Sequence, residues 1–155
     1  MKENSDMKIV IGSDHAGYEL KEAIKKHLSS KKISFKDIGT DSSESTDYPD
    51  YAKSVALYVG KSGGLGILIC GTGLGMCMAA NKFREVRAAT CRDANDARMA
   101  REHNNANVLC LGGRTTDEGK AKEIVDTFIQ TKASPVDRHR KRLDKIAEIE
   151  EENFK

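Results

Sequence analysis

A cysteine followed by three alternating glycines is the stretch of this sequence best suited to chemistry. Cys70 closes a short apolar run at residues 67–69, and the chain continues as Gly71-Thr72-Gly73-Leu74-Gly75. The N–H groups of a glycine turn at the start of a helix bind anions and developing negative charge. A thiol near a helix N-terminus can lose its proton and then acts as a base or a nucleophile. The segment therefore predicts an anion-binding turn beside a reactive thiol, although a cysteine at a strand end is more often only a small buried hydrophobic residue.

The same turn fits neither of the common nucleotide-binding motifs. A dinucleotide fingerprint would need a glycine at position 76, where the chain has Met76, and a P-loop would end in Gly-Lys-Ser/Thr. What remains is a turn that holds one oxyanion. The alternative is a tight strand-to-helix turn whose glycines serve packing alone.

Two pairs of polar residues could add binding or acid–base groups. Asp14 and His15 follow the first apolar run in a polar turn, and His103 and Asn104 stand in a predicted loop. Histidine is suited to proton transfer near neutral pH. Both pairs remain ambiguous, because an aspartate in a turn often only caps a helix.

Two arginines near the end of the chain could bind a phosphate. Arg138 and Arg142 are four residues apart and share one face of a predicted helix. Guanidinium groups bind phosphate through paired hydrogen bonds. Arg140 and Lys141 lie between them, so a solvated basic patch is the alternative, and composition alone favours it.

The overall composition narrows the class of protein. The chain has 155 residues, enough for one domain with its own core, and a net charge of +2. Nucleic-acid and membrane-surface binders need a larger basic excess, and the apolar runs are too short to span a bilayer. The cysteines form no C-x-x-C pair, so we expect no zinc site and predict reduced thiols in a cytoplasmic protein. We expect residues 1–7 to form a disordered tail and residues 8–155 a single domain.

Apolar patterns predict strands that alternate with helices. The predicted strands cover residues 8–12, 33–38, 67–69, 87–91 and 107–111. The predicted helices cover residues 18–30, 49–59, 93–102, 117–131 and 136–151, with another that starts at residue 76. This alternation is typical of a parallel sheet with helices on both faces, and such sheets bind ligands beyond the carboxyl ends of their strands.

The turns that follow the strands should therefore share one rim, which includes Asp14, the glycine turn and Arg114. His103 precedes the fifth strand, so it would have to reach this rim differently, for example from a neighbouring subunit. The last predicted helix is highly charged and has only a thin apolar stripe. We expect it to dock on a partner rather than to join the core.

Six ordered motifs resemble those of the type B ribose-5-phosphate isomerases. The resemblance covers residues 8 to about 150, and the wider family includes galactose-6-phosphate and allose-6-phosphate isomerases. The motifs are Gly12-Ser13-Asp14-His15-Ala16-Gly17, Thr46-Asp47-Tyr48-Pro49, Cys70-Gly71-Thr72-Gly73-Leu74-Gly75, Ala79-Ala80-Asn81-Lys82, His103-Asn104 and Arg138-His139.

The resemblance implies a three-layer α/β/α sandwich with a Rossmann-like, five-stranded parallel sheet. It also implies an enzyme without cofactor or metal that works as a homodimer, in some members a tetramer, with its active sites at the subunit interface. The charged last helix would then pack on the other subunit. No nucleic acid or membrane is implied as a partner.

Residue roles follow from the same resemblance. Cys70 matches the catalytic base and His103 the acid/base that opens the sugar ring. One branch of the family replaces the cysteine with a glutamate just after the glycine turn, and Met76 at that position places this chain in the cysteine branch. The anion hole matches Thr72 and the N–H groups of Gly71, Gly73, Leu74 and Gly75. The other substrate-binding positions match Asp14, His15, Asn104, Arg114, Arg138 and Arg142, the arginines for the phosphate.

The predicted function is the interconversion of D-ribose 5-phosphate and D-ribulose 5-phosphate through an enediolate, in the pentose phosphate pathway. A base within hydrogen-bond reach moves a proton between C2 and C1, and oriented N–H donors hold the charge of the intermediate. An isomerase of a six-carbon sugar phosphate, of allose or galactose, is the nearest alternative. A non-catalytic sugar-phosphate binding module is a further one.

Overall fold

The computed structural model describes residues 7–154. The tail predicted for residues 1–7 therefore lies, apart from the exposed Met7, outside the described residues, and its disorder stays a prediction. Five parallel strands form one sheet in the order β2-β1-β3-β5-β4. The strands are β1 (Ile9–Ser13), β2 (Lys36–Asp37), β3 (Leu65–Cys70), β4 (Ala88–Thr90) and β5 (Val108–Gly112).

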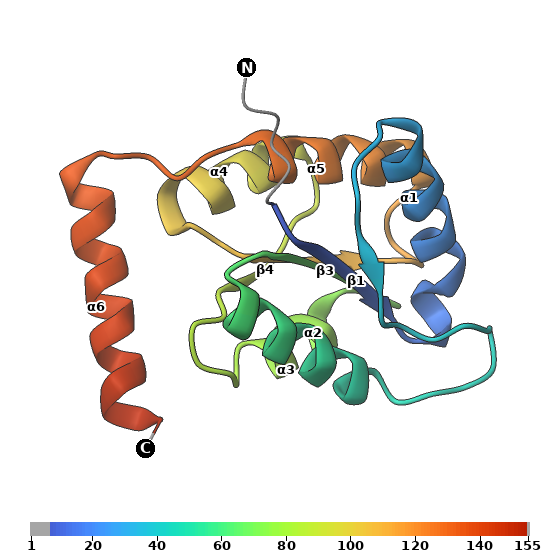
Figure 1. The fold of residues 1–155 in the computed structure, drawn as a ribbon, viewed down its shortest axis with the longest axis horizontal. Helices are drawn as coiled ribbons and strands as arrows, with labels where there is room; N and C mark the ends of the chain where they lie inside the picture. The colour runs from blue at the N-terminus through green and yellow to red at the C-terminus, as the bar shows by residue number, and fades with distance from the viewer. Residues whose placement is uncertain (1–6, 155) are drawn as a thin grey trace.

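Helices cover both faces of the sheet, so the molecule has three layers (Figure 1). The helices α1, α4 and α5 pack on one face, and α2 and α3 pack on the other. This is the predicted α/β/α arrangement. The helices are α1 (Tyr18–Ser30), α2 (Tyr48–Ser62), α3 (Leu74–Ala80), α4 (Ala94–Asn104), α5 (Glu118–Gln130) and α6 (Asp137–Asn153), with a short 3₁₀ turn, η1 (His15–Gly17), before α1.

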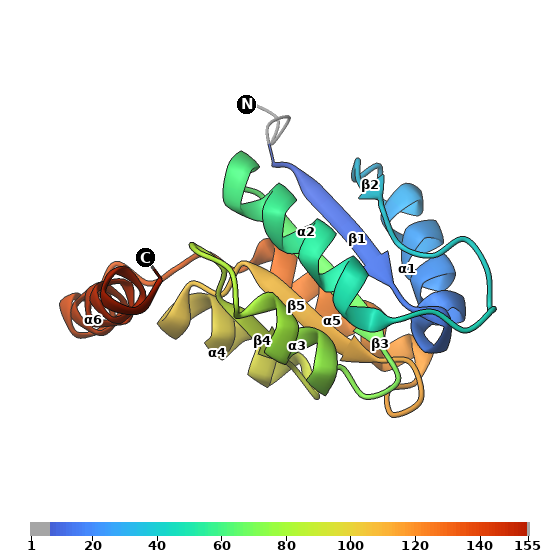
Figure 2. The same cartoon turned by 90° about the horizontal axis from the view of Figure 1, so that it is seen from below.

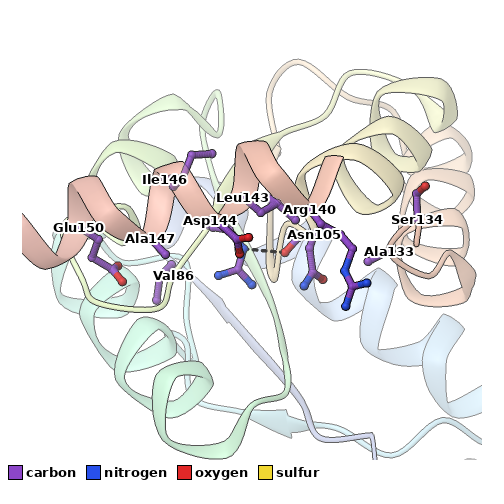
Figure 3. A pocket seen from close by; sticks show the side chains of 11 residues that line it. Val86, Asn105, Ala133, Ser134, Arg140, Leu143, Asp144, Ile146, Ala147 and Glu150 are labelled. Carbon is purple, nitrogen blue, oxygen red and sulfur yellow. Dashed lines mark hydrogen bonds between the residues drawn. The ribbon is translucent and has the colours of Figure 1, made fainter. Parts of the chain in front are cut away.

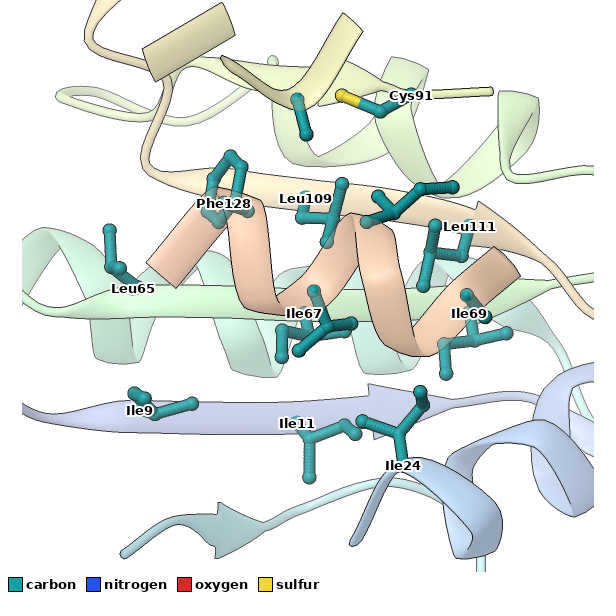
Figure 4. Close-up of a cluster of buried hydrophobic side chains, with 14 of the residues drawn as sticks. Ile9, Ile11, Ile24, Leu65, Ile67, Ile69, Cys91, Leu109, Leu111 and Phe128 are labelled. Carbon is teal, nitrogen blue, oxygen red and sulfur yellow. The ribbon is translucent and has the colours of Figure 1, made fainter. Parts of the chain in front are cut away.

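The central strand β3 forms the middle of the core. Ile67 and Ile69 point into the cluster under α1 and α5 (Figure 4), whereas Leu68 and Cys70 point into the cluster under α2 and α3. Every residue of β3 is buried, as the unbroken apolar run predicts for a strand covered on both faces. Burial of each leucine or isoleucine side chain in this strand stabilises the fold by about 1.5–3 kcal/mol. The core thus fixes the strand whose end carries the glycine turn.

Most predicted boundaries differ from the observed ones by one or two residues, and β2 and α2 differ by more. Only Lys36–Asp37 of the predicted strand at residues 33–38 pairs with β1, at the edge of the sheet as expected. An ion pair of 2.6 Å between the buried Lys21 and the partly exposed Asp37 joins this short strand to α1. Helix α2 continues through Gly60 to Ser62, because the residue with the left-handed backbone that ends it is Gly63, at φ +70°.

Helix α4 is longer than predicted, and this changes the setting of two candidate residues. Asp93 caps it as expected, accepting the N–H of Asp96. The helix runs to Asn104, so His103 and Asn104 lie in its last turn and not in a loop; Asn105, at φ +43°, ends it.

Helix α6 stands apart from the sandwich, joined to α5 by an extended segment (Figures 1 and 2). Its side chains touch the body at few points, among them Glu150, which accepts the N–H of Glu85 at 2.7 Å. Ile146 and Ile149 are 45% and 59% exposed. The thin apolar stripe is thus not part of the core, as its narrowness predicted.

Candidate active site

Three strand ends meet beside Cys70, at the carboxyl edge of the sheet. In the register of the sheet, Ser13 pairs with Ile69 and Cys70 pairs with Gly112. Backbone hydrogen bonds then join the turns: Asp14 N–H donates to the carbonyl of Ile69 at 3.2 Å, and Gly113 N–H to that of Cys70 at 2.7 Å. The turns after β1, β3 and β5 therefore form one rim.

The glycine turn aims a backbone donor at the thiol. Cys70 is 5% exposed, and its Sγ accepts the N–H of Gly73 at 3.1 Å. This bond requires the left-handed backbone of Gly73, at φ +81°, and a Cβ there would lie 3.0 Å from the carbonyl carbon of Leu111. If Cys70 were a thiolate, the N–H of Gly73 would donate a hydrogen bond to its negatively charged sulfur and stabilise it.

Two of the four N–H groups predicted for the anion hole already have partners inside the turn. That of Gly73 goes to the sulfur of Cys70, and that of Leu74 goes to Oγ1 of Thr72 at 3.3 Å. An incoming oxyanion would have to draw these donors away. The anion hole therefore stays a prediction, although the donors that it needs converge on one turn.

Arg114 and Tyr48 lie over the two ends of this turn. A Cβ at Gly71 would be 3.4 Å from Nη1 of Arg114, so the guanidinium group covers that glycine. A Cβ at Gly75 would be 2.6 Å from the ring of Tyr48, so the tyrosine ring lies against the first turn of α3. Tyr48 belongs to one of the six motifs, but the sequence predicts no role for it. Nothing in its local pattern shows that it meets Gly75.

Asp14 and His15 are both held by backbone groups. Asp14 is 5% exposed, and its Oδ1 caps η1 by accepting the N–H of Gly17 at 3.1 Å. Nδ1 of His15 accepts the N–H of Thr46 at 3.1 Å, so a neutral His15 carries its proton on Nε2. Both residues lie at the rim as predicted, with the loop before α2 held against them.

The remaining predicted residues lie at the opposite edge of the sheet. Helix α4 leaves the carboxyl end of β4 and returns to the amino edge, where Arg87, just before β4, bonds to Asn105 and Asn107 at 2.9 and 2.7 Å. His103 and Asn104 are at this end of α4. Within one chain they are therefore not brought together with Cys70.

Arg138 and Arg142 belong to the same remote group. They lie on α6, whose His139 ring is 4.4 Å from the ring of His103. The structure thus divides the predicted site residues into two sets. The rim set contains Asp14, His15, Cys70, Gly71, Thr72, Gly73, Leu74, Gly75 and Arg114, and the remote set contains His103, Asn104, Arg138 and Arg142.

Of the four free cysteines, only Cys70 stands at the rim. Cys77 is on α3, and a hydrogen bond from the Cys110 thiol lowers its pKa to about 6. The hydrogen bond with Cys77, together with burial, raises the pKa of Cys110, and burial raises that of Cys91 to about 12. Cys91 and Cys110 are buried between sheet and helices, whereas the partly buried Cys77 stands on the helix after the glycine turn, with its N–H donated to the carbonyl of Gly73. Position, rather than acidity, therefore selects Cys70.

The cavities beside α6 contain no member of the rim set. One, of about 350 Å³, lies between α6 and the loop before β4 (Figure 3) and includes Val86, Leu143 and Ile146 in its lining. Another, of about 600 Å³, borders the edge strand β4. Within residues 7–154, no three side chains of His, Cys, Asp or Glu are grouped as metal ligands. In the same part of the chain, no helix combines the length and apolarity needed to cross a membrane.

Comparison with known proteins identifies the family. The model of the family described as Ribose/Galactose Isomerase matches residues 9–146. The chain belongs to the ribose/galactose isomerase family. The predicted resemblance to its type B ribose-5-phosphate isomerases is confirmed at the level of sequence and fold.

Individual members of the ribose/galactose isomerase family are similar over almost their whole length. Ribose-5-phosphate isomerase B of Escherichia coli is 45% identical over 146 residues, 93% of this chain and 97% of that protein. The structure of the Clostridium thermocellum ribose-5-phosphate isomerase B has a TM-score of 0.91 at 47% identity, covering 94% of this chain and 99% of that one. The Mycoplasma genitalium enzyme, in a crystal structure with bound ribulose-5-phosphate, has a TM-score of 0.90 at 44% identity, covering 95% and 98%.

Proposed function

We propose that this chain interconverts D-ribose 5-phosphate and D-ribulose 5-phosphate, as a step of the pentose phosphate pathway. One observation carries the proposal: a buried thiol at the carboxyl edge of the sheet, with the N–H of Gly73 aimed at its sulfur. The chain that carries this thiol is 44% identical to the Mycoplasma genitalium enzyme, whose crystal structure contains bound ribulose-5-phosphate.

Cys70 acts as the base in this reaction. Its thiolate takes the proton from C2 of the open-chain aldose, and the same proton is returned to C1 through an enediolate. The negative charge of the intermediate falls beside Thr72 and the N–H groups of the glycine turn. Oriented donors of this kind contribute about 2.7–4 kcal/mol each to the transition state.

The remote set supplies ring opening and phosphate binding. His103 exchanges protons with the cyclic sugar, because an imidazole can both give and take a proton near neutral pH. Arg138 and Arg142 hold the phosphate, together with Arg114 at the rim. Binding energy from the phosphate orients the reacting carbons.

A second copy of the chain must then complete each site. The rim set and the remote set lie at opposite edges of one sheet, so one chain cannot bring both to one sugar. Support comes from α6, which exposes Ile146 and Ile149 next to the open edge of β4. In the proposed homodimer, or a tetramer built from it, α6 and the end of α4 bring the remote set to the partner's rim.

Two alternatives differ in substrate or in class. An isomerase of allose 6-phosphate or galactose 6-phosphate would use the same residues on a longer sugar. A non-catalytic sugar-phosphate binding module would keep the fold without turnover. The names of the relatives favour the five-carbon reaction, and four free thiols agree with the cytoplasm as the proposed location.

One experiment decides among them. The purified full-length chain is incubated separately with ribose 5-phosphate, allose 6-phosphate and galactose 6-phosphate, and the ketose formed is measured by NMR. We expect kcat/KM to be highest for ribose 5-phosphate. A higher value for either six-carbon sugar would reassign the substrate, and tight binding of all three without any ketose would establish the binding module.

A further inference from the structure

Two histidine rings lie against each other where α4 meets α6. The ring centroids of His103 and His139 are 4.4 Å apart, and the planes are inclined by 33°. Although α6 is mostly exposed, His139 is only 6% exposed. Its Nδ1 is buried, and no group in residues 7–154 forms a hydrogen bond with it. A buried polar atom left without a partner is uncommon and calls for a reason.

The charges around the pair make a second proton on it unfavourable. His103 and Glu102 face His139 from α4, and Arg138 and Arg142 face it from α6. Burial lowers the pKa of His139, and the positive charges of His103 and the two arginines lower it further, against the weaker opposing effect of Glu102. Two interacting imidazoles titrate as one unit. These groups therefore disfavour a proton on His139.

We propose that His139 is a positioning residue for His103: its neutral ring fixes the His103 imidazole and favours the single proton of the pair on it. The proposal rests on the ring-opening role of His103 given above. In that step, protonated His103 gives its proton to the ring oxygen as the bond from C1 to that oxygen breaks. The proton of the C1 hydroxyl returns to His103 as the carbonyl forms, so the pair starts and ends with one proton.

A polar ring serves this purpose better than an apolar one. A nitrogen of a neutral imidazole can accept a hydrogen bond from a neighbouring imidazolium or from its water, whereas a benzene ring in the same place offers no acceptor atom and only the weaker attraction of its π face. His139→Phe keeps the flat ring and the packing but removes the nitrogens. His139→Gln keeps a polar partner and removes the ring.

The test measures the pH dependence of kcat/KM on cyclic ribose 5-phosphate in the assembled enzyme. For His139→Phe we expect the active range to move about one pH unit toward acid; for an imidazole of ordinary pKa, about 6.5, this is a loss of about tenfold at pH 8 and about threefold at pH 6. His139→Gln should keep most of the wild-type profile. Losses that are equal at every pH, in either variant, would show that His139 only packs and would overturn the proposal.

A second measurement does not depend on turnover. The imidazole C2–H resonances are followed by NMR against pH in the wild type and in His139→Phe, without substrate. The His103 resonance should titrate at lower pH in the variant, while His27, which pairs with Asp126 at 2.8 Å on the α1–α5 side, should not move. If the His103 resonance titrated at the same pH in the variant, the positioning role of His139 would be refuted, even if the chain isomerises ribose 5-phosphate. A shifted titration in a chain without isomerase activity would refute the proposed function alone.

Discussion

The rim around Cys70 and the end of α4 with α6 are two contrasting parts of one proposed site. The rim is built into the sheet: its turns are joined by backbone hydrogen bonds, and Cys70 is 5% exposed. Of the remote set, Arg138 and Arg142 stand on α6, which touches its own chain at few points and leaves apolar side chains in solvent, and His103 and Asn104 end the neighbouring α4. A single chain can fold the first part completely. In the proposed homodimer, the second gains its function only where the partner lies.

The largest expected effect comes from removing the base at the rim. Cys70→Ala should lower kcat by about 10³-fold, because a positioned general base contributes about 10²–10⁴-fold. Binding of ribose 5-phosphate, measured by calorimetry, should stay within a few fold of wild type.

Cys77→Ala is the matched control, since Cys77 is a thiol on α3 with a pKa lowered to about 6. If Cys77→Ala lost turnover and Cys70→Ala kept it, the chemistry would belong to the layer under α3 and not to the rim.

A mixture of two inactive variants tests whether the two parts meet across subunits. His103→Ala should lower kcat/KM on the cyclic sugar by about 10²-fold, because it removes a general acid/base. When it is unfolded and refolded with an equal amount of Cys70→Ala, mixed dimers should each contain one intact site. Activity should then return to roughly a quarter of wild type, as random pairing in a two-fold dimer requires.

The control for this mixture is each variant refolded alone. A mixture no more active than the average of its two components would mean that both sets act within one chain.

The smallest expected effect is the difference between an alanine placed in the glycine turn of the rim and one placed in an ordinary turn. Gly73 and Gly63 both have positive φ, +81° and +70°, but a Cβ on Gly63 would meet nothing within 4 Å. Gly63→Ala should cost about 1–2 kcal/mol of unfolding free energy from its backbone conformation alone. Gly73→Ala should cost more, because its Cβ would press on Leu111, and it should also impair turnover by moving the donor to Cys70.

Urea unfolding and kcat of both variants measure the difference. Equal losses of stability with full activity in both would mean that the geometry of the glycine turn does not matter to the thiol.

Local features of the chain were predicted well because their causes are local. Helix α1 has the predicted limits, Asp93 caps α4, and the apolar run at residues 67–69 forms the buried middle of β3. The predictions failed where a neighbouring segment decides the outcome. The strand at residues 33–38 shrank to two paired residues at the sheet edge, and α4 continued through His103 and Asn104.

The sequence by itself determined the chemistry-bearing segments, the alternation of strands and helices, and the family. Each depends on spacing within a few residues or on motifs that can be read along the chain. Only the tertiary structure decided that Arg114 covers Gly71, that Tyr48 lies on Gly75, and that His103 lies beside His139. Such contacts follow from strand order and helix packing between segments distant in sequence, which local patterns do not specify. The same packing places Cys70 and His103 at opposite edges of the sheet, which is the physical reason to look for the rest of the site in a second copy of the chain.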